Sequence, residues 1–171
     1  KETYKGFVRG GANLPVDKQE DLRRLNKEIS ILQLTFGQNL LAETNHYKMI
    51  IEDKSDLTGL PKGIIDAASE TANGDKATSG KWVFTLHNSS VLPFLQFSDK
   101  RELREEIFTA YINRCNNNDE YDNKEIIDKL IRFRLDKARL LGYNTYAGFV
   151  LEERMSKKPE NVYNLLNQIW T

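Results

Sequence analysis

The feature that most constrains the fold is a long stripe of apolar residues between positions 17 and 44. Large apolar side chains recur every three or four residues, at Leu22, Leu25, Ile29, Leu32, Phe36 and Leu40. This spacing puts them on one face of a helix, so the pattern predicts a helix from Asp17 to Thr44. Ile31, Leu34 and Leu41 lie off the stripe, which predicts packing on two sides. We expect this helix to be the spine of a helical bundle.

Two short stretches depart from the helical pattern. Trp82–Leu86 is rich in aromatic and β-branched residues, and Tyr47–Glu52 is the other β-prone stretch. A single strand leaves its backbone groups unpaired, so each stretch needs a partner. We predict that Met49–Glu52 pairs with Val83–Leu86. Pro61 suits the first turn of a helix that continues to about Ala72 between the two strands.

The rest of the chain predicts helices joined by polar loops. Residues 1–14 are predicted to be an irregular lead-in, because Gly10-Gly11 interrupts any regular element. The expected fold is mainly α, with a long spine helix and a small two-stranded β ribbon. The further predicted helices are a short turn capped by Ser89 or Ser90, one beginning at a capping box Asp99–Glu102, one from Asp122–Glu125 to Gly142, and two shorter ones at 144–155 and after Pro159.

Length and composition bound the class of protein. The 171 residues suit one domain or one piece of a larger protein. The 25 basic and 25 acidic side chains cancel, so there is no global field that favours nucleic acid or an anionic membrane. We therefore predict neither partner. The first residue is Lys1 and the last residues continue an apolar helical pattern, so we expect an excised segment of a longer protein.

Metal chemistry has only weak candidates in this sequence. Glu43 and His46 have the Glu-x-x-His spacing of half a di-iron site, but such a site needs a second pair, and His87 has no glutamate three residues before it. The sequence has no His-Glu-x-x-His pattern and no pair of cysteines for zinc. The prediction is therefore that this segment holds no catalytic, cofactor-binding or metal-binding residue.

Three other features favour structural roles. The loop Asn116–Asp122 carries oxygen ligands but lacks the glycine and terminal glutamate of a calcium loop. Cys115, the only cysteine, continues a helical pattern and is interpreted as a small buried apolar residue rather than a nucleophile. Three arginines alternate with acidic residues, which predicts a solvated, ion-paired helix face: Arg132, Arg134 and Arg139.

Pieces spread along the chain carry a resemblance to a known family. The sequence resembles an internal stretch of the bacterial peptidyl-dipeptidases, which belong to the thimet oligopeptidase and neurolysin family of zinc metallopeptidases. Order and spacing agree over nearly the whole chain. The matching pieces are Arg9–Leu14, Phe36–Asn45, Leu57–Pro61, Val83–Leu86, Arg101–Glu105, Glu120–Asn123, Ala138–Tyr143 and Tyr146–Glu152.

The resemblance implies a mainly helical enzyme with two lobes beside a deep channel. Zinc is then held by a His-Glu-x-x-His helix and a later glutamate, all in a part of the enzyme after the part resembled here. Residues 1–171 would be a single segment of the N-terminal lobe, packed against the remaining lobe of the same chain. The whole enzyme would use zinc to remove dipeptides from the C-termini of oligopeptide substrates. A cytoplasmic location is expected, with periplasmic or exported as the alternative.

Two readings from other classes stay open at this point. One is a free-standing helical module that binds partners through exposed apolar faces. The other is a di-iron helical protein built around Glu43 and His46. A His-Glu-x-x-His motif further along the gene distinguishes the peptidase from the module, and elemental analysis addresses the iron.

Overall fold

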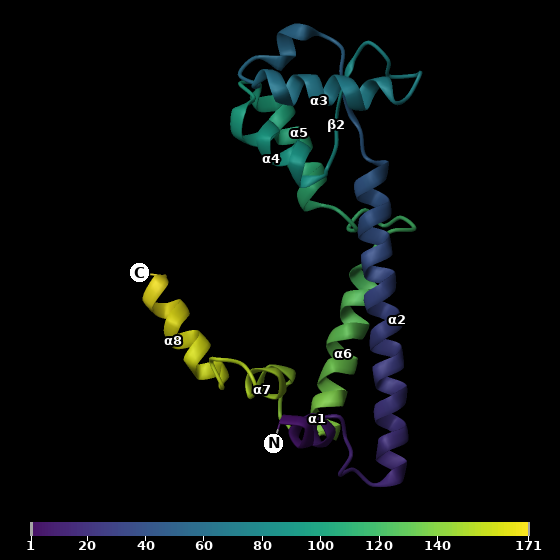
Figure 1. Cartoon of the computed structure of the whole chain (residues 1–171), viewed down its shortest axis with the longest axis vertical. Helices are drawn as coiled ribbons and strands as arrows, with labels where there is room; N and C mark the ends of the chain where they lie inside the picture. Colours follow the sequence, from purple (N-terminus) through teal and green to yellow (C-terminus); the bar gives the residue numbers. More distant parts are fainter. Residues whose placement is uncertain (1, 171) are drawn as a thin grey trace. The chain divides into compact units, whose positions relative to one another are not determined.

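The structure is a computed structural model that describes residues 2–170 (Figure 1). The predicted fold class is confirmed: the described chain is mainly α-helical, with one long helix and one two-stranded sheet. In chain order the elements are α1 (Glu2–Arg9), α2 (Val16–His46), β1 (Met49–Ile51), the 3-10 helix η1 (Lys54–Leu57), α3 (Lys62–Asn73), β2 (Trp82–Phe84), α4 (Asn88–Phe97), α5 (Arg101–Ile112), α6 (Lys124–Leu140), α7 (Tyr146–Leu151) and α8 (Pro159–Ile169).

The elements form two compact units. Unit 1 contains the described residues of Lys1–Thr35 and Glu125–Thr171, and unit 2 is Phe36–Lys124. The helix α2 contributes its first part to unit 1 and its last part to unit 2. None of the helices in the described part of the chain is long and apolar enough to cross a membrane.

The predicted spine helix is confirmed, but its packing differs from the prediction. None of the six residues of the predicted stripe is exposed, and Leu22 and Ile29 are buried. The residues off the stripe are exposed by 47%, 63% and 59%, for Ile31, Leu34 and Leu41. Packing on two sides is therefore wrong for this chain, because nothing in its described part covers that side of α2.

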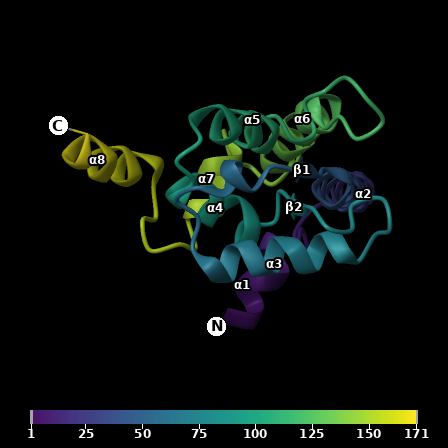
Figure 2. The ribbon, with the colours of Figure 1, turned by 90° about the horizontal axis from the view of Figure 1, so that it is seen from above.

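The predicted strand pairing is confirmed, and the ribbon lies in the core of unit 2. β1 and β2 are antiparallel, with Met49 opposite Phe84 and Ile51 opposite Trp82. In the view of Figure 2, α3 and α5 lie on opposite sides of the ribbon. The ring of Phe84 meets that of Phe94 of α4 edge to face, with centroids 4.6 Å apart. Such a ribbon is too short to be stable alone, so its stability comes from the helices that cover it.

Two helix starts in unit 2 differ from the prediction. The N-cap of α4 is His87, and the Ser90 hydroxyl instead accepts a hydrogen bond from the Thr85 N–H at 3.0 Å. The N-cap of α5 is Lys100, without a side-chain cap. The Asp99 N–H donates to the carbonyl of Thr58, at 2.9 Å. Tertiary contacts have overruled the local capping signals.

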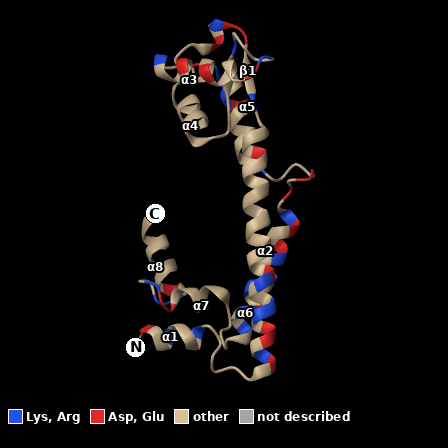
Figure 3. Cartoon of the chain, turned by 45° about the vertical axis from the view of Figure 1, so that its right-hand side comes forward, with Lys and Arg blue, Asp and Glu red and all other residues tan. Residues whose placement is uncertain are grey.

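Unit 1 shows one further correction, at the N-terminus. Residues 2–9 form α1 instead of an irregular lead-in. The two glycines follow this helix rather than interrupt it, and Gly11 has a left-handed backbone with φ +90°. Figures 1 and 3 both show α6 alongside α2, and the colouring of Figure 3 marks many charged residues along this pair. The predicted cap at Gly142 is confirmed by φ +87° and by a bond from the Tyr143 N–H to the Ala138 carbonyl.

Candidate functional site

The two histidines do not come together as a metal site. His46 is the last residue of α2 and His87 precedes α4, and they line different hollows of unit 2. Within residues 2–170 no group of three or more His, Cys, Asp or Glu side chains is arranged to hold a metal ion. The residues present therefore do not fit a catalytic zinc, which takes about three protein ligands. We derive no metal-dependent step from them.

Glu43 has a structural use that its spacing to His46 did not indicate. Its carboxylate accepts hydrogen bonds from the backbone N–H of Cys115 and from the side-chain amide of Asn117. These bonds tie the end of α2 to the loop that follows α5. Among the described residues, Glu43 and His46 belong to no group of three or more side chains that could hold a metal ion, so the structure gives the di-iron reading no support.

Cys115 is buried, as predicted, but its backbone is not helical. α5 ends at Ile112, and Cys115 has φ +58°, in the left-handed region. Burial raises the pKa of its thiol to about 11, and the neighbouring Glu43 carboxylate adds to the increase. The thiolate is the nucleophilic form of cysteine, so this residue is unreactive at neutral pH.

The loop Asn116–Asp122 uses its carboxylates internally. Asp122 accepts hydrogen bonds from the backbone N–H groups of Asn118 and Lys124, at 2.8 and 2.9 Å. The Lys124 side chain and these N–H groups lower the pKa of the Asp122 carboxyl to about 2. The loop is thus held by its own donors.

An acidic hollow of about 450 Å³ lies beside this loop. We call it the acidic hollow; it is lined by Glu43, His46, Tyr47, Leu86, Ala110, Asn117, Asp119, Glu120 and Tyr121. The Tyr47 hydroxyl is buried and has no hydrogen-bond partner within residues 2–170. Burial, with a smaller contribution from Glu106, raises its pKa to about 12, so the phenol stays protonated.

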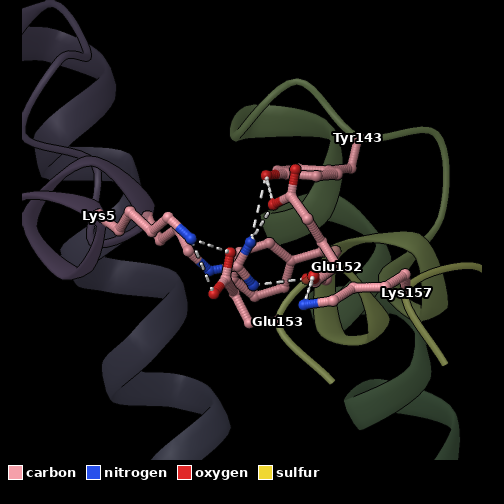
Figure 4. Close-up of polar contacts among 7 residues, drawn as sticks. Lys5, Tyr143, Glu152, Glu153 and Lys157 are labelled. Carbon is pink, nitrogen blue, oxygen red and sulfur yellow. Dashed lines mark hydrogen bonds and ion pairs between the residues drawn. The ribbon is translucent and has the colours of Figure 1, made fainter. Parts of the chain in front are cut away.

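A cluster around Arg9 joins α1 to α7 within unit 1, and Figure 4 labels Lys5, Tyr143, Glu152 and Glu153 of this cluster. The Arg9 guanidinium lies 4.3 Å from the centre of the Phe149 ring and donates to the Phe149 carbonyl at 2.5 Å. The guanidinium also donates to the Glu152 carboxylate and, at 3.3 Å, to the Tyr143 hydroxyl. The Tyr143 hydroxyl in turn donates to Glu152 at 2.5 Å. Lys5 and Glu153 add an ion pair at 3.4 Å. The planar guanidinium suits this combination of stacking and forked bonding.

The predicted ion-paired arginine face holds only in part. Arg132 is exposed and pairs with Asp128 at 2.9 Å, as predicted. Arg134 is half-buried and lies 5.5 Å from the Tyr146 ring, and its Nε has no hydrogen-bond partner among the described residues. Arg134 is therefore a packing residue rather than part of a solvated face.

The pieces that carry the family resemblance meet in pairs in the structure. Arg9 of one piece contacts residues of two others, at Tyr143 and Glu152. Asn39 of a second piece donates to Asn123, at the end of another. The matching pieces are therefore contact points of a helical scaffold. Sequence reasoning missed these contacts because they join positions far apart in the chain, and single positions carry no signal of the partner.

Comparison with known proteins agrees with this picture. The sequence pattern of "Peptidase family M3" matches residues 94–170. Organellar oligopeptidase A of Arabidopsis thaliana is 34% identical over 168 residues, which cover 94% of this chain and 21% of the relative. Dipeptidyl carboxypeptidase of Escherichia coli is 32% identical over 166 residues, covering 97% of this chain and 24% of the relative. Oligopeptidase A of Escherichia coli is 29% identical over 167 residues, covering 95% and 24%.

Residues 94–170 match peptidase family M3, and nearly the whole chain is similar to a segment of oligopeptidase A and of dipeptidyl carboxypeptidase. The chain spans between a fifth and a quarter of the length of these relatives. The resemblance found in the sequence is thereby confirmed.

Proposed function

We propose that this chain is a non-catalytic part of a zinc-dependent oligopeptidase that removes dipeptides from the C-termini of oligopeptides. One observation carries the proposal. The chain aligns over 97% of its length with a dipeptidyl carboxypeptidase, yet this alignment spans only 24% of that enzyme. The substrates of the whole protein are accordingly proposed to be oligopeptides, and the partner of this segment is the remaining lobe of the same polypeptide.

The proposed role of the segment is to build part of the wall of the substrate channel, in an N-terminal lobe. Two features support it. The resembling pieces contact one another through packing and hydrogen bonds, as at Arg9 and Tyr143, which is typical of a scaffold. Residues 2–170 also provide no fit for zinc, so the zinc of the whole enzyme is proposed to be bound by residues outside this segment. The assignment of residues 1–171 to one such lobe stays a prediction, because compact units within one chain do not test it.

The location proposed for the whole protein is cytoplasmic, with an exported protein as the alternative. The relatives include one named as probable cytosolic and one named as chloroplastic or mitochondrial, so relatedness alone fits more than one compartment. Net neutrality of the chain supports the proposal that neither nucleic acid nor a membrane is a partner.

The complete gene tests the proposed function. Its coding sequence after residue 171 should contain a His-Glu-x-x-His motif, which supplies two zinc ligands and a general base. The full-length product should release C-terminal dipeptides from short peptides, and a chelator should abolish the release. A gene without the motif, or a full-length product without chelator-sensitive cleavage, contradicts the proposal.

A second candidate is a free-standing module that binds a helical partner. The observation that favours it is α8, where Tyr163, Leu166 and Ile169 are exposed at helical spacing. In Figure 3 the ribbon of α8 is almost free of the colours that mark Lys, Arg, Asp and Glu. Such a face is typical of an interaction surface, but it is equally the face that the rest of a longer enzyme would cover. Absence of the zinc motif from the complete gene would favour the module.

A further inference from the structure

A groove of about 590 Å³ lies in unit 2, between α3 on one side and β2 with the start of α4 on the other. We call it the α3 groove. Its α3 side includes Ala67 and Ala68, and its other side includes Val83 and Phe84. The small alanine side chains leave room between the helix and the strand. The groove therefore has an apolar floor that fits one or two small apolar side chains.

Four polar side chains line the same groove without a side-chain hydrogen bond to the described part of the chain, and all but Thr85 are exposed. Asn45, Thr85, His87 and Ser89 make no side-chain hydrogen bond to any described residue. Each carries a group that can donate and a group that can accept. A peptide main chain presents the complementary set, one N–H donor and one carbonyl acceptor at each residue. An apolar floor with a few convergent polar groups is the usual composition of a ligand site.

The charge of the α3 groove is opposite to that of the acidic hollow. Among the residues that line the groove, Lys48 is the one lysine, and there is no arginine, aspartate or glutamate. The Lys48 ammonium lies 3.0 Å from Asp75, and both side chains are more than two-fifths exposed. An exposed pair of this kind is weak and exchanges readily, so the ammonium is free to take another carboxylate. The acidic hollow, by contrast, has Glu43, Asp119 and Glu120 in its lining.

We propose that the α3 groove binds an oligopeptide through a carboxylate at Lys48 and through main-chain hydrogen bonds. The peptide main chain bonds to the Asn45, Thr85, His87 and Ser89 side chains, and a small apolar side chain lies over Ala67 and Ala68. This inference rests on the proposed function for the class of ligand, and adds a binding site in a segment that carries no catalytic group. The carboxylate is either the peptide C-terminus or an acidic side chain.

The test is an NMR titration of the isotopically labelled 171-residue chain with tetra-alanine. The expected result is a saturable shift of the amide signals of Ala67, Thr85 and Ser89. Tetra-alanine amide and an acetylated, amidated peptide containing one aspartate identify the source of the carboxylate. If only the free acid binds, the carboxylate that Lys48 recognises is the peptide C-terminus. If the aspartate peptide binds equally well, Lys48 recognises an acidic side chain.

Matched variants locate the binding. Ala67→Trp fills the groove from an exposed helix position and should weaken binding at least about tenfold, whereas Glu70→Trp on the same helix, outside the groove, should leave it unchanged. Lys48→Gln should weaken binding of the free acid about tenfold, as expected for loss of a charge-assisted bond, and should leave the amide unaffected. The thermal unfolding midpoint of each variant shows that it is folded.

Several outcomes overturn the proposal. They are no signal shifts at the highest soluble peptide concentration, shifts confined to the acidic hollow, or an Ala67→Trp chain that binds like the parent. These failures leave the proposed function standing, because that function is measured on the full-length gene product and does not require this segment to bind peptide alone. Conversely, loss of chelator-sensitive cleavage in the full-length product refutes the proposed function whatever the titration shows.

Discussion

Asn39 donates a hydrogen bond from its side-chain amide to Oδ1 of Asn123, at 3.0 Å, across 84 positions of the chain. Asn123 is only 1% exposed, and its own amide donates to the carbonyl of Phe36 at 3.2 Å. Its backbone N–H donates to the carbonyl of Cys115 at 2.9 Å. One buried side chain thus joins α2 to the loop that precedes α6, and its polar atoms have partners on both sides.

Replacing Asn123 should destabilise the fold. Asn123→Ala removes the partner of the Asn39 amide and the additional bond to the Phe36 carbonyl, and a buried group left unpaired costs about 1–3 kcal/mol. We expect the free energy of unfolding in urea to fall by about that amount or more. Asn164→Ala, on the exposed surface of α8, is the control and should change it by less than about 0.5 kcal/mol. Equal losses for the two variants would refute the role given to Asn123.

Two glycines form a matched pair for a second prediction. Gly59 has φ +84°, and a Cβ there would lie 2.3 Å from the carbonyl oxygen of Phe97. A Cβ on Gly63, in α3, meets nothing within 4 Å. Gly59→Ala should therefore lower the free energy of unfolding by about 1–3 kcal/mol or more, through strain and collision with backbone. Gly63→Ala should be neutral or stabilise by up to about 1 kcal/mol. The same urea unfolding curves measure both, and a neutral Gly59→Ala would contradict the close approach.

Cys115 should react slowly with thiol reagents while the chain is folded. Its pKa is raised from 9.0 to about 11, so at pH 8 the thiolate fraction is about a hundredfold smaller than in the unfolded chain. The rate of reaction with a disulfide reagent at pH 8 should fall by at least that factor relative to the chain in denaturing urea. Comparable rates in the two conditions would show that Cys115 is accessible and not perturbed.

The bonds to Asp122 predict a loss of stability in acid. The pKa of this carboxyl is lowered from 3.8 to about 2, so its stabilising effect is complete above the unfolded-state pKa and disappears as the pH falls through the folded-state pKa. Asp122→Asn cannot ionise. The stability difference between parent and variant should be constant from about pH 5 to 7 and shrink between about pH 4 and 2. Urea midpoints over this range measure it, and a difference that persists unchanged at pH 2 would contradict the ionic account.

The fold was largely predictable because the periodic signals in the sequence are long. The helix predicted from the stripe, Asp17–Thr44, matches α2 within two residues at each end. The aromatic and β-branched residues near Trp82 marked the ribbon and its partner, because an unpaired strand needs one. The failures occurred where tertiary contacts decide. The N-cap of α5 is Lys100, and the neighbouring Asp99 N–H bonds the Thr58 carbonyl. The helix α1 forms despite Gly10 because the glycines lie just beyond its end.

The contacts of the scaffold were much less predictable. In the sequence, Arg9 and Asn123 stand out only as members of matching pieces and Glu43 as part of a metal spacing, and their partners lie far away along the chain. Exposure was also misjudged: Ile31, Leu34 and Leu41 look like core residues by composition, but in this chain they face solvent. A single sequence shows which residues prefer burial, and not whether a covering element is present.

The most direct test of the central claim is an assay of the 171-residue chain itself. The purified chain is incubated with short quenched peptides, with and without added zinc, and cleavage is followed by mass spectrometry. Since residues 2–170 hold no group of three metal-ligating side chains and a catalytic zinc needs about three ligands and a base, we expect no hydrolysis in either condition. Chelator-sensitive release of C-terminal dipeptides, at a rate that survives repurification, would contradict the account of this segment as a non-catalytic scaffold.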